Sequence, residues 1–183
     1  MTFATHILLA TAIRDHADAY EKALERHGVH VHVARTGGDA LAAAFGHPPD
    51  CIVIDLRLPD MSGWDLCAQL KRLPALCATP VIVLTPDITA AHCDEGMRAG
   101  CHAWLARPTV AEDLVVVIGD VIDQAQAQPL SRDAALLGAR HACPACTSTH
   151  LRATVRISPV QYYRCLECGF YWRVEVVPIE RSA

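Results

Sequence analysis

The sequence of 183 residues lacks several features that would define its class at once. It has no run of about eighteen consecutive apolar residues, the length of a membrane-spanning helix, and its first residues lack the basic and then apolar order of a signal peptide. No segment repeats at the period of a solenoid or a propeller. We therefore expect a cytoplasmic protein with no membrane partner, made of one ordinary domain and a smaller second one.

Nine cysteines are present, and in a cytoplasmic chain we expect them to be thiols or metal ligands rather than disulfides. Charge is divided unevenly. Residues 1–127 carry 9 Lys and Arg against 16 Asp and Glu, a net of −7, whereas residues 128–183 carry 7 against 4, a net of +3. An Ala-rich and Gln-rich segment, 124–140, separates the two parts. We predict a first domain over residues 1–127, a linker over 128–140 and a second domain over 141–178.

The first domain alternates short apolar runs with segments of helical periodicity. The runs predict strands at 6–11, 29–34, 51–55, 80–85 and 101–106, and the amphipathic segments predict helices at 14–27, 38–46, 63–72, 88–99 and 110–126. Parallel strands need crossover helices, which cover both faces of the sheet. The predicted fold class is therefore α/β, a doubly wound parallel sheet of five strands. Sites in such sheets form beyond the carboxyl ends of the strands, where Asp55, Thr85 and Arg107 fall.

The stretch CIVIDLRLPDMSG, residues 51–63, is an apolar run that ends in Asp55 and continues into a loop with proline and glycine. Thr85 ends the fourth predicted strand, Trp104 lies in the fifth and Arg107 follows it. With these residues, about two thirds of the chain resembles a response-regulator receiver (CheY-like) domain. The resemblance implies two-component signalling or a phosphorelay, with a histidine kinase as partner. It assigns Asp55 as phosphoacceptor, Thr85 as switch hydroxyl and Trp104 as switch aromatic, and places Arg107 where the family has lysine.

The sequence departs from that family at the metal-binding positions. The family has two adjacent acidic residues after its first strand, which hold Mg²⁺ together with the phosphoacceptor, and here those positions are Thr11 and Ala12. The usual pocket has a double negative charge that a divalent metal neutralises, whereas one carboxylate and one arginine are already neutral. Arginine is also no simple replacement for lysine, because its guanidinium group is planar and permanently charged.

From this charge count we predict that Asp55 pairs with Arg107, directly or through Thr85. The residues then give little support for Mg²⁺ as a cofactor, and the domain is an atypical receiver, or pseudo-receiver. The alternative is a phosphorylatable receiver that uses Asp55 and binds Mg²⁺ in another way.

The second domain contains two Cys-x-x-Cys pairs separated by eighteen residues: Cys143 and Cys146, then Cys165 and Cys168. Each pair can place two thiolates on one metal, so the four cysteines predict a tetrahedral structural zinc site. Three short strands are expected around them, over 151–157, 160–165 and 169–177, and the whole resembles a zinc ribbon. A domain of about 40 residues has too little core to fold without a metal. Rubredoxin-type iron is the alternative metal, which would give a red protein.

No catalytic constellation beyond the receiver pocket is present, so we do not expect an enzyme. Three functions agree with the sequence. The first is a non-enzymatic signalling or regulatory protein, whose ribbon binds protein and whose receiver docks a partner or forms a homodimer. The second is a transcription factor whose ribbon binds DNA, and the third is a phosphorylatable response regulator. Basic and aromatic residues in the ribbon favour DNA binding. A zinc ion with four thiolates, however, has a net negative charge that cancels the basic excess of the ribbon. Because DNA binding needs a net basic face, this charge balance favours the first function.

Overall fold

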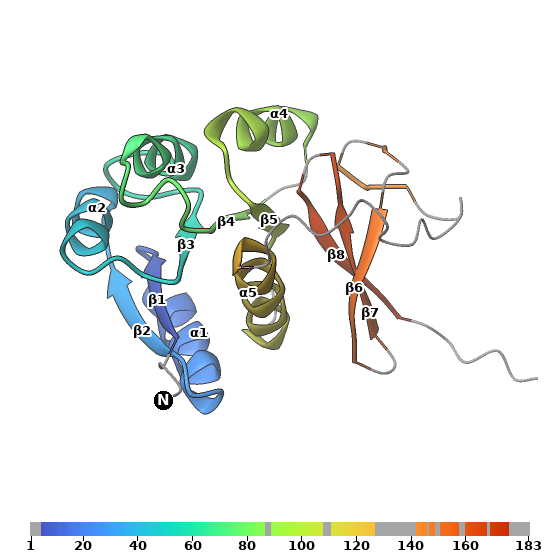
Figure 1. Cartoon of the computed structure of the whole chain (residues 1–183), viewed down its shortest axis with the longest axis horizontal. Helices are drawn as coiled ribbons and strands as arrows, with labels where there is room; N and C mark the ends of the chain where they lie inside the picture. The colour runs from blue at the N-terminus through green and yellow to red at the C-terminus, as the bar shows by residue number, and fades with distance from the viewer. Residues whose placement is uncertain are drawn as a thin grey trace, which may run out of the picture.

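The computed structural model of this chain describes residues 5–86, 89–107, 111–126, 142–145, 147–148, 151–157, 160–167 and 169–175. The predicted linker over 128–140 lies outside these ranges, as do two of the predicted metal ligands, Cys146 and Cys168. The described residues form two sheets, one of five strands and one of three, with five helices around the first (Figure 1).

The five-stranded sheet has the order β2-β1-β3-β4-β5 and is parallel throughout. Its strands are β1 His6–Ala10, β2 His30–Ala34, β3 Cys51–Asp55, β4 Val81–Thr85 and β5 Ala103–Ala106. The helices are α1 Arg14–Arg26, α2 Gly37–Gly46, α3 Gly63–Arg72, α4 Ala90–Ala99 and α5 Ala111–Gln126. The predicted doubly wound α/β fold is confirmed. No helix within the described ranges is both long and apolar enough to cross a membrane.

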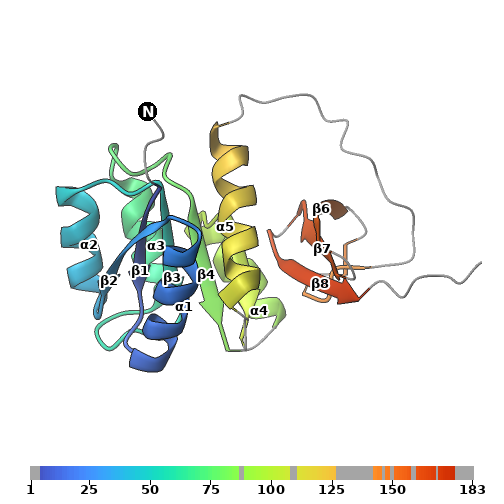
Figure 2. The same cartoon turned by 90° about the horizontal axis from the view of Figure 1, so that it is seen from below.

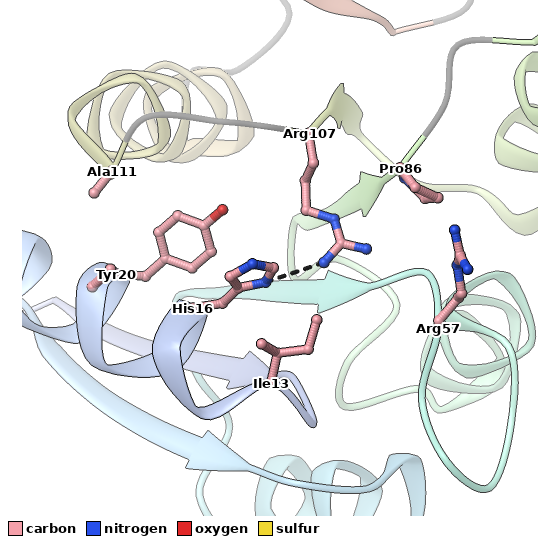
Figure 3. A pocket seen from close by; sticks show the side chains of 8 residues that line it. Ile13, His16, Tyr20, Arg57, Pro86, Arg107 and Ala111 are labelled. Carbon is pink, nitrogen blue, oxygen red and sulfur yellow. Dashed lines mark hydrogen bonds between the residues drawn. The ribbon is translucent and has the colours of Figure 1, made fainter.

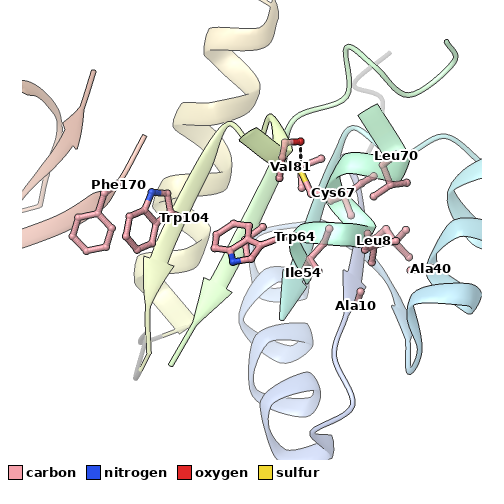
Figure 4. Close-up of a cluster of buried hydrophobic side chains, with 14 of the residues drawn as sticks. Leu8, Ala10, Ala40, Ile54, Trp64, Cys67, Leu70, Val81, Trp104 and Phe170 are labelled. Carbon is pink, nitrogen blue, oxygen red and sulfur yellow. Dashed lines mark hydrogen bonds between the residues drawn. The ribbon is translucent and has the colours of Figure 1, made fainter. Parts of the chain in front are cut away.

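Helices cover both faces of this sheet, as the apolar pattern requires. Helices α1 and α5 lie on one face, and α2, α3 and α4 lie on the other (Figure 1). Side chains of a strand point alternately to the two faces, so Ile7 and Leu9 pack toward α1 and α5 while Leu8 packs toward α2 and α3. Every residue of β3 and β4 is buried. Figure 4 shows the apolar cluster on the face of α2, α3 and α4, which contains Leu8.

In the first domain, two predicted boundaries are wrong by two residues, each for a local reason. Helix α4 begins at residue 90 rather than 88, because the Thr89 hydroxyl accepts a hydrogen bond from the backbone N–H of His92 and caps the helix. Strand β5 begins at residue 103 rather than 101. Gly100 ends α4 with φ 76°, and the backbone N–H of Cys101 donates back to the carbonyl of Gly96, so Cys101 belongs to the helix end.

The second sheet consists of β6 Leu151–Ile157, β7 Val160–Cys165 and β8 Tyr171–Glu175, antiparallel in the order β6-β7-β8. Strands β6 and β7 have the predicted bounds, and β8 begins two residues later than predicted. The sheet lies beside β5 and α5 (Figures 1 and 2). The core reflects this arrangement, because Cys165 and Phe170 are buried in the same cluster as Trp104 of β5.

Candidate functional site

Side chains from four strands meet at the carboxyl-terminal edge of the five-stranded sheet. Thr11 follows β1, Asp55 and Thr85 end β3 and β4, and Arg107 follows β5. They converge because the strands run parallel. Among the described residues, the buried polar or charged side chains are Thr11, Asp55 and Thr85, each exposed by 1% or less. The polar interior of this domain is therefore concentrated at the edge where sites form in such folds.

The carboxylate of Asp55 has a different partner at each oxygen. The Thr11 hydroxyl donates to Oδ2 at 2.5 Å, and Nη1 of Arg107 forms an ion pair with Oδ1 at 3.4 Å. Oδ1 has no hydrogen bond within the described structure, so Arg107 compensates its charge across a distance longer than an ordinary hydrogen bond. The structure contains the ion pair that the charge count predicts, and the pairing is direct rather than through Thr85.

Arg107 has a second contact, with His16 of α1, that the sequence did not indicate. Its Nη1 lies 3.1 Å from Nδ1 of His16 (Figure 3). A guanidinium can only donate, so Nδ1 of His16 accepts in this contact. The Arg107 side chain is 13% exposed, and its Nε is buried without a hydrogen-bond partner. His16 therefore helps to hold the cation beside Asp55. The sequence places His16 in the first turn of the first helix but does not otherwise indicate this role.

Thr85 connects the site to α4. Its hydroxyl oxygen lies 3.2 Å from Nδ1 of His92, in the first turn of that helix. The His92 ring also lies 6.4 Å from the ring of Trp64 on α3. His92 is a second site residue that sequence reasoning did not place here. The contact couples the first turn of α4 to the end of β4.

Two further described positions beyond the strand ends are Ala12 and Asp60. Ala12 is exposed and has no ligand atom on its side chain. Asp60, beyond β3, accepts hydrogen bonds from the backbone N–H groups of Gly37 at 2.7 Å and Gly38 at 2.8 Å, and these bonds lower its pKa. Its carboxylate therefore holds the start of α2. Within the part of the chain that the structure describes, no three His, Cys, Asp or Glu side chains lie close enough to share a metal.

Trp104, the predicted switch aromatic, is completely buried under the second sheet. Its ring lies 4.6 Å from that of Phe170 at an interplanar angle of 48°, and the two residues form an isolated parallel β-bridge. Phe170 in turn stacks on Trp172 at 5.9 Å (Figure 4 labels the first two). Phe170 of the second domain therefore packs against the five-stranded sheet.

Polar contacts extend this junction from β5 to α5. Tyr171 donates its hydroxyl to Asp120, and Gln124 donates its amide to the Tyr171 hydroxyl at 3.3 Å. Burial raises the pKa of Tyr171, so the phenol stays protonated and keeps donating. Arg164 donates to the carbonyl of His102 at 2.9 Å and to the side chain of Gln124. The second sheet is thus bound to the first domain by both apolar and hydrogen-bonded contacts.

Acid is expected to weaken this junction through His102. Burial, followed by the cations of Lys71 and Arg164, lowers the pKa of His102 from 6.5 to about 4. The unfolded chain therefore takes up this proton at higher pH than the folded chain. The contribution of His102 to stability is fully present above pH 6.5 and is lost as the pH falls toward about 4.

We expect the free energy of unfolding to fall by about 1–2 kcal/mol across that window, after allowance for solvent screening. Urea unfolding at a series of pH values measures it. A His102→Gln variant, whose amide oxygen can still accept from the backbone N–H of Val81, should show a flatter pH dependence. An equally steep dependence in this variant would show that another group is responsible.

The two Cys-x-x-Cys segments form turns of the same kind in their described parts. The backbone N–H of Thr147, at φ 59°, donates to the carbonyl of Cys143 at 2.9 Å. Likewise the N–H of Gly169, at φ 73°, donates to the carbonyl of Cys165 at 3.0 Å. In each turn the residue after the second cysteine is left-handed, a conformation that glycine adopts freely and threonine does not. Cys143 and Cys165 are both buried, in the same apolar cluster.

The structure thus brings together four of the predicted pocket residues: Thr11, Asp55, Thr85 and Arg107. Ala12 lies at the exposed rim, and Trp104 packs away from the pocket against the second domain. Of the four predicted metal ligands, two are described. The site gains His16 and His92, which come from the helices that flank the strand ends.

These features define a class of protein. It is a doubly wound α/β domain with a buried aspartate at the end of the third strand, a hydroxyl at the end of the fourth and a cation after the fifth. In comparison with known families, residues 7–119 match the response regulator receiver domain. The chain belongs to the response regulator receiver family. Membership of this family gives the domain a role in signalling and regulation.

Individual relatives agree with this assignment. The chain is similar to the probable transcriptional regulator ycf29 of Pyropia yezoensis, 28% identical over 159 residues, which are 87% of this chain and 64% of the relative. It is also similar to protein PilH of Pseudomonas aeruginosa, 32% identical over 99 residues, 54% of this chain and 82% of PilH. The solved structure of CheY4 of Vibrio cholerae matches with a TM-score of 0.63 at 24% identity, over 65% of this chain and 99% of CheY4. The chain spans just under two thirds of the length of the first relative.

Proposed function

We propose that this chain is a non-enzymatic signalling or regulatory protein with a degenerate receiver domain, in which Asp55 is half of a fixed ion pair rather than a phosphoacceptor. The arrangement around Asp55 carries the proposal. Thr11 stands where the family has an acidic residue and donates to one carboxylate oxygen, while Arg107 pairs with the other. Mg²⁺ binds through carboxylates and substrate phosphate and neutralises the transferring phosphoryl group. One carboxylate already paired with a cation is a poor ligand set for it.

We further propose that residues 141–178 form a zinc ribbon after the linker over 128–140. Cys143, Cys146, Cys165 and Cys168 would hold the metal. Two matching turns support this, each opened by a buried cysteine and closed by a left-handed residue. Bound zinc would supply folding energy that so small a sheet lacks, and it would have no catalytic part.

The ribbon is proposed to serve protein interaction. The family resemblance implies docking or dimerisation through α4, β5 and α5, but in this chain β8 lies against β5 and the Tyr171 hydroxyl bonds to α5. A partner or a second copy of the chain would therefore meet a composite surface. Among the described residues of the second sheet, β6 is an edge strand and Leu166 is 48% exposed, and we propose that they meet such a partner.

A DNA-binding regulator is the second candidate, because a relative named a probable transcriptional regulator aligns over 87% of this chain. The side-chain contacts favour protein interaction instead. Arg164 is engaged with His102 and Gln124, and Phe170 is buried under Trp104, so neither is presented to a nucleic acid. A salt-dependent mobility shift with duplex DNA would support the second candidate.

Phosphorylation of Asp55 is the reaction that tests the first proposal. The zinc-loaded chain is incubated with acetyl phosphate and Mg²⁺ and its intact mass is measured. We expect no addition of about 80 Da, the mass of one phosphoryl group. A receiver domain that carries the acidic pair serves as the reagent control. A Mg²⁺-dependent addition that disappears in Asp55→Asn would overturn the proposal.

A further inference from the structure

A pocket of ≈ 640 Å³ opens beside the Asp55–Arg107 pair, between α1 and the loops that follow β3, β4 and β5 (Figure 3). Its described lining consists of Ile13, His16, Ala19, Tyr20, Arg57, Pro86, Arg107 and Ala111. This volume falls within the range of small-molecule sites, about 300–1,000 Å³. The pocket is therefore large enough for a small molecule as well as for an ion.

The lining is cationic. It includes two arginines and a histidine but no carboxylate, in a chain whose net charge is −4. Asp55 is 1% exposed, and its charge is compensated by Arg107. Arg57 therefore adds a positive charge that no carboxylate of the described lining balances. A concave surface of one sign attracts ligands of the opposite sign.

The two arginines reach the pocket from opposite sides. Figure 3 shows Arg57 rising from the loop after β3 and Arg107 descending from the end of β5. One terminal nitrogen of Arg107 binds His16, and the other is turned away from His16 toward the side where Arg57 lies. Two guanidinium groups that face one space can bind the oxygens of a phosphate or carboxylate with several parallel hydrogen bonds.

The rest of the lining is apolar. Ile13 is one of the exposed large apolar side chains of the described residues, at 42%, and the ring of Tyr20 also lines the pocket (Figure 3). Ala19 of α1 also lines the pocket. An inorganic ion would use only the arginines and leave these walls in water, whereas an organic anion would cover them as well.

We propose that this pocket binds a small organic anion, with its oxyanion head group between Arg57 and Arg107 and its apolar part against Ile13, Ala19 and Tyr20. Such a ligand would be an input to the receiver domain. It would contact the same arginine that compensates Asp55. The inference goes beyond the proposed function, because the pocket can bind an anion whether or not Asp55 accepts a phosphoryl group.

Phenyl phosphate, which has both an oxyanion and an apolar part, is the probe. It is titrated into the ¹⁵N-labelled, zinc-loaded full chain, and shifts of backbone and arginine side-chain resonances are followed by NMR. We expect saturable shifts at His16, Tyr20 and Ala111 with a Kd of about 1 mM or below. Inorganic phosphate should bind roughly tenfold more weakly, and phenol should not bind.

Three variants localise the binding. Arg57→Gln should weaken it about tenfold, and Ala19→Phe, which fills the apolar wall, should do the same. Arg98→Gln removes an exposed arginine of α4 and should leave the Kd unchanged. The proposal is overturned if phenyl phosphate does not saturate by about 10 mM, if inorganic phosphate binds equally well, or if Arg57→Gln and Arg98→Gln have equal effects. The intact-mass experiment reports on Asp55 separately, so the two proposals can fail independently.

Discussion

Replacing Arg107 by alanine is expected to destabilise the receiver domain by about 3–5 kcal/mol, because it leaves a buried carboxylate without its cation. Asp55 is 1% exposed, and after the substitution its remaining partner is the single hydroxyl of Thr11. Urea unfolding followed by far-ultraviolet circular dichroism measures the loss. The pocket is neutral only while Asp55 and Arg107 are both present. The loss of stability should therefore far exceed that caused by removing an ordinary surface arginine.

Two further variants separate the ion pair from the simple loss of an arginine. Arg98→Ala, on the exposed face of α4, should change the free energy of unfolding by no more than about 0.5 kcal/mol. The double variant Asp55→Asn/Arg107→Gln has no isolated charge and should recover a large part of the stability lost in Arg107→Ala. If Arg107→Ala were as mild as Arg98→Ala, the ion pair would not be what compensates Asp55.

If the second sheet is the proposed zinc ribbon, removal of the metal is expected to unfold it and expose Trp104. Structural zinc in small domains contributes on the order of 10 kcal/mol to folding, so a strong chelator, or Cys165→Ser, should abolish β6, β7 and β8 together. Trp104 is fully buried against Phe170 and should then give red-shifted fluorescence. The helices of the first domain should remain, because α1 to α5 pack on their own sheet.

Metal analysis and a matched cysteine variant complete this experiment. We expect one zinc per chain and a colourless protein, whereas iron would make the protein red. Cys77→Ser changes an exposed cysteine of the first domain and should leave metal content and fluorescence unaltered. A metal-free protein whose second sheet remains folded would contradict the zinc ribbon.

Local patterns predicted the elements well. Strands β3, β6 and β7 have the bounds that their apolar runs predicted, because each run stops at a turn or a charge. The convergence of Asp55, Thr85 and Arg107 followed from a general rule, that the carboxyl ends of parallel strands share one edge. The Asp55–Arg107 pair followed from comparing the charges at these positions with those of the usual receiver pocket. These inferences needed the residue sequence, one structural rule and the family resemblance.

Contacts between distant segments were not predictable in the same way. Nothing in the spacing of Trp104 and Phe170 indicates that their rings meet, since both positions also fit a core of their own domain. The contact of His16 with Arg107 joins α1 to the end of β5 and depends on side-chain directions that periodicity does not specify. The pocket beside them was missed for the same reason, because its lining comes from four separate segments.

The most direct test of the degenerate receiver compares two proteins in the same phosphorylation reaction. The first is the chain itself, and the second is Thr11→Asp/Ala12→Asp/Arg107→Lys, which restores the acidic pair and the lysine of the family. After incubation with acetyl phosphate and Mg²⁺, intact mass spectrometry should show an addition of about 80 Da on the restored variant and none on the original chain. A stoichiometric, Mg²⁺-dependent addition to Asp55 of the original chain would contradict the proposal.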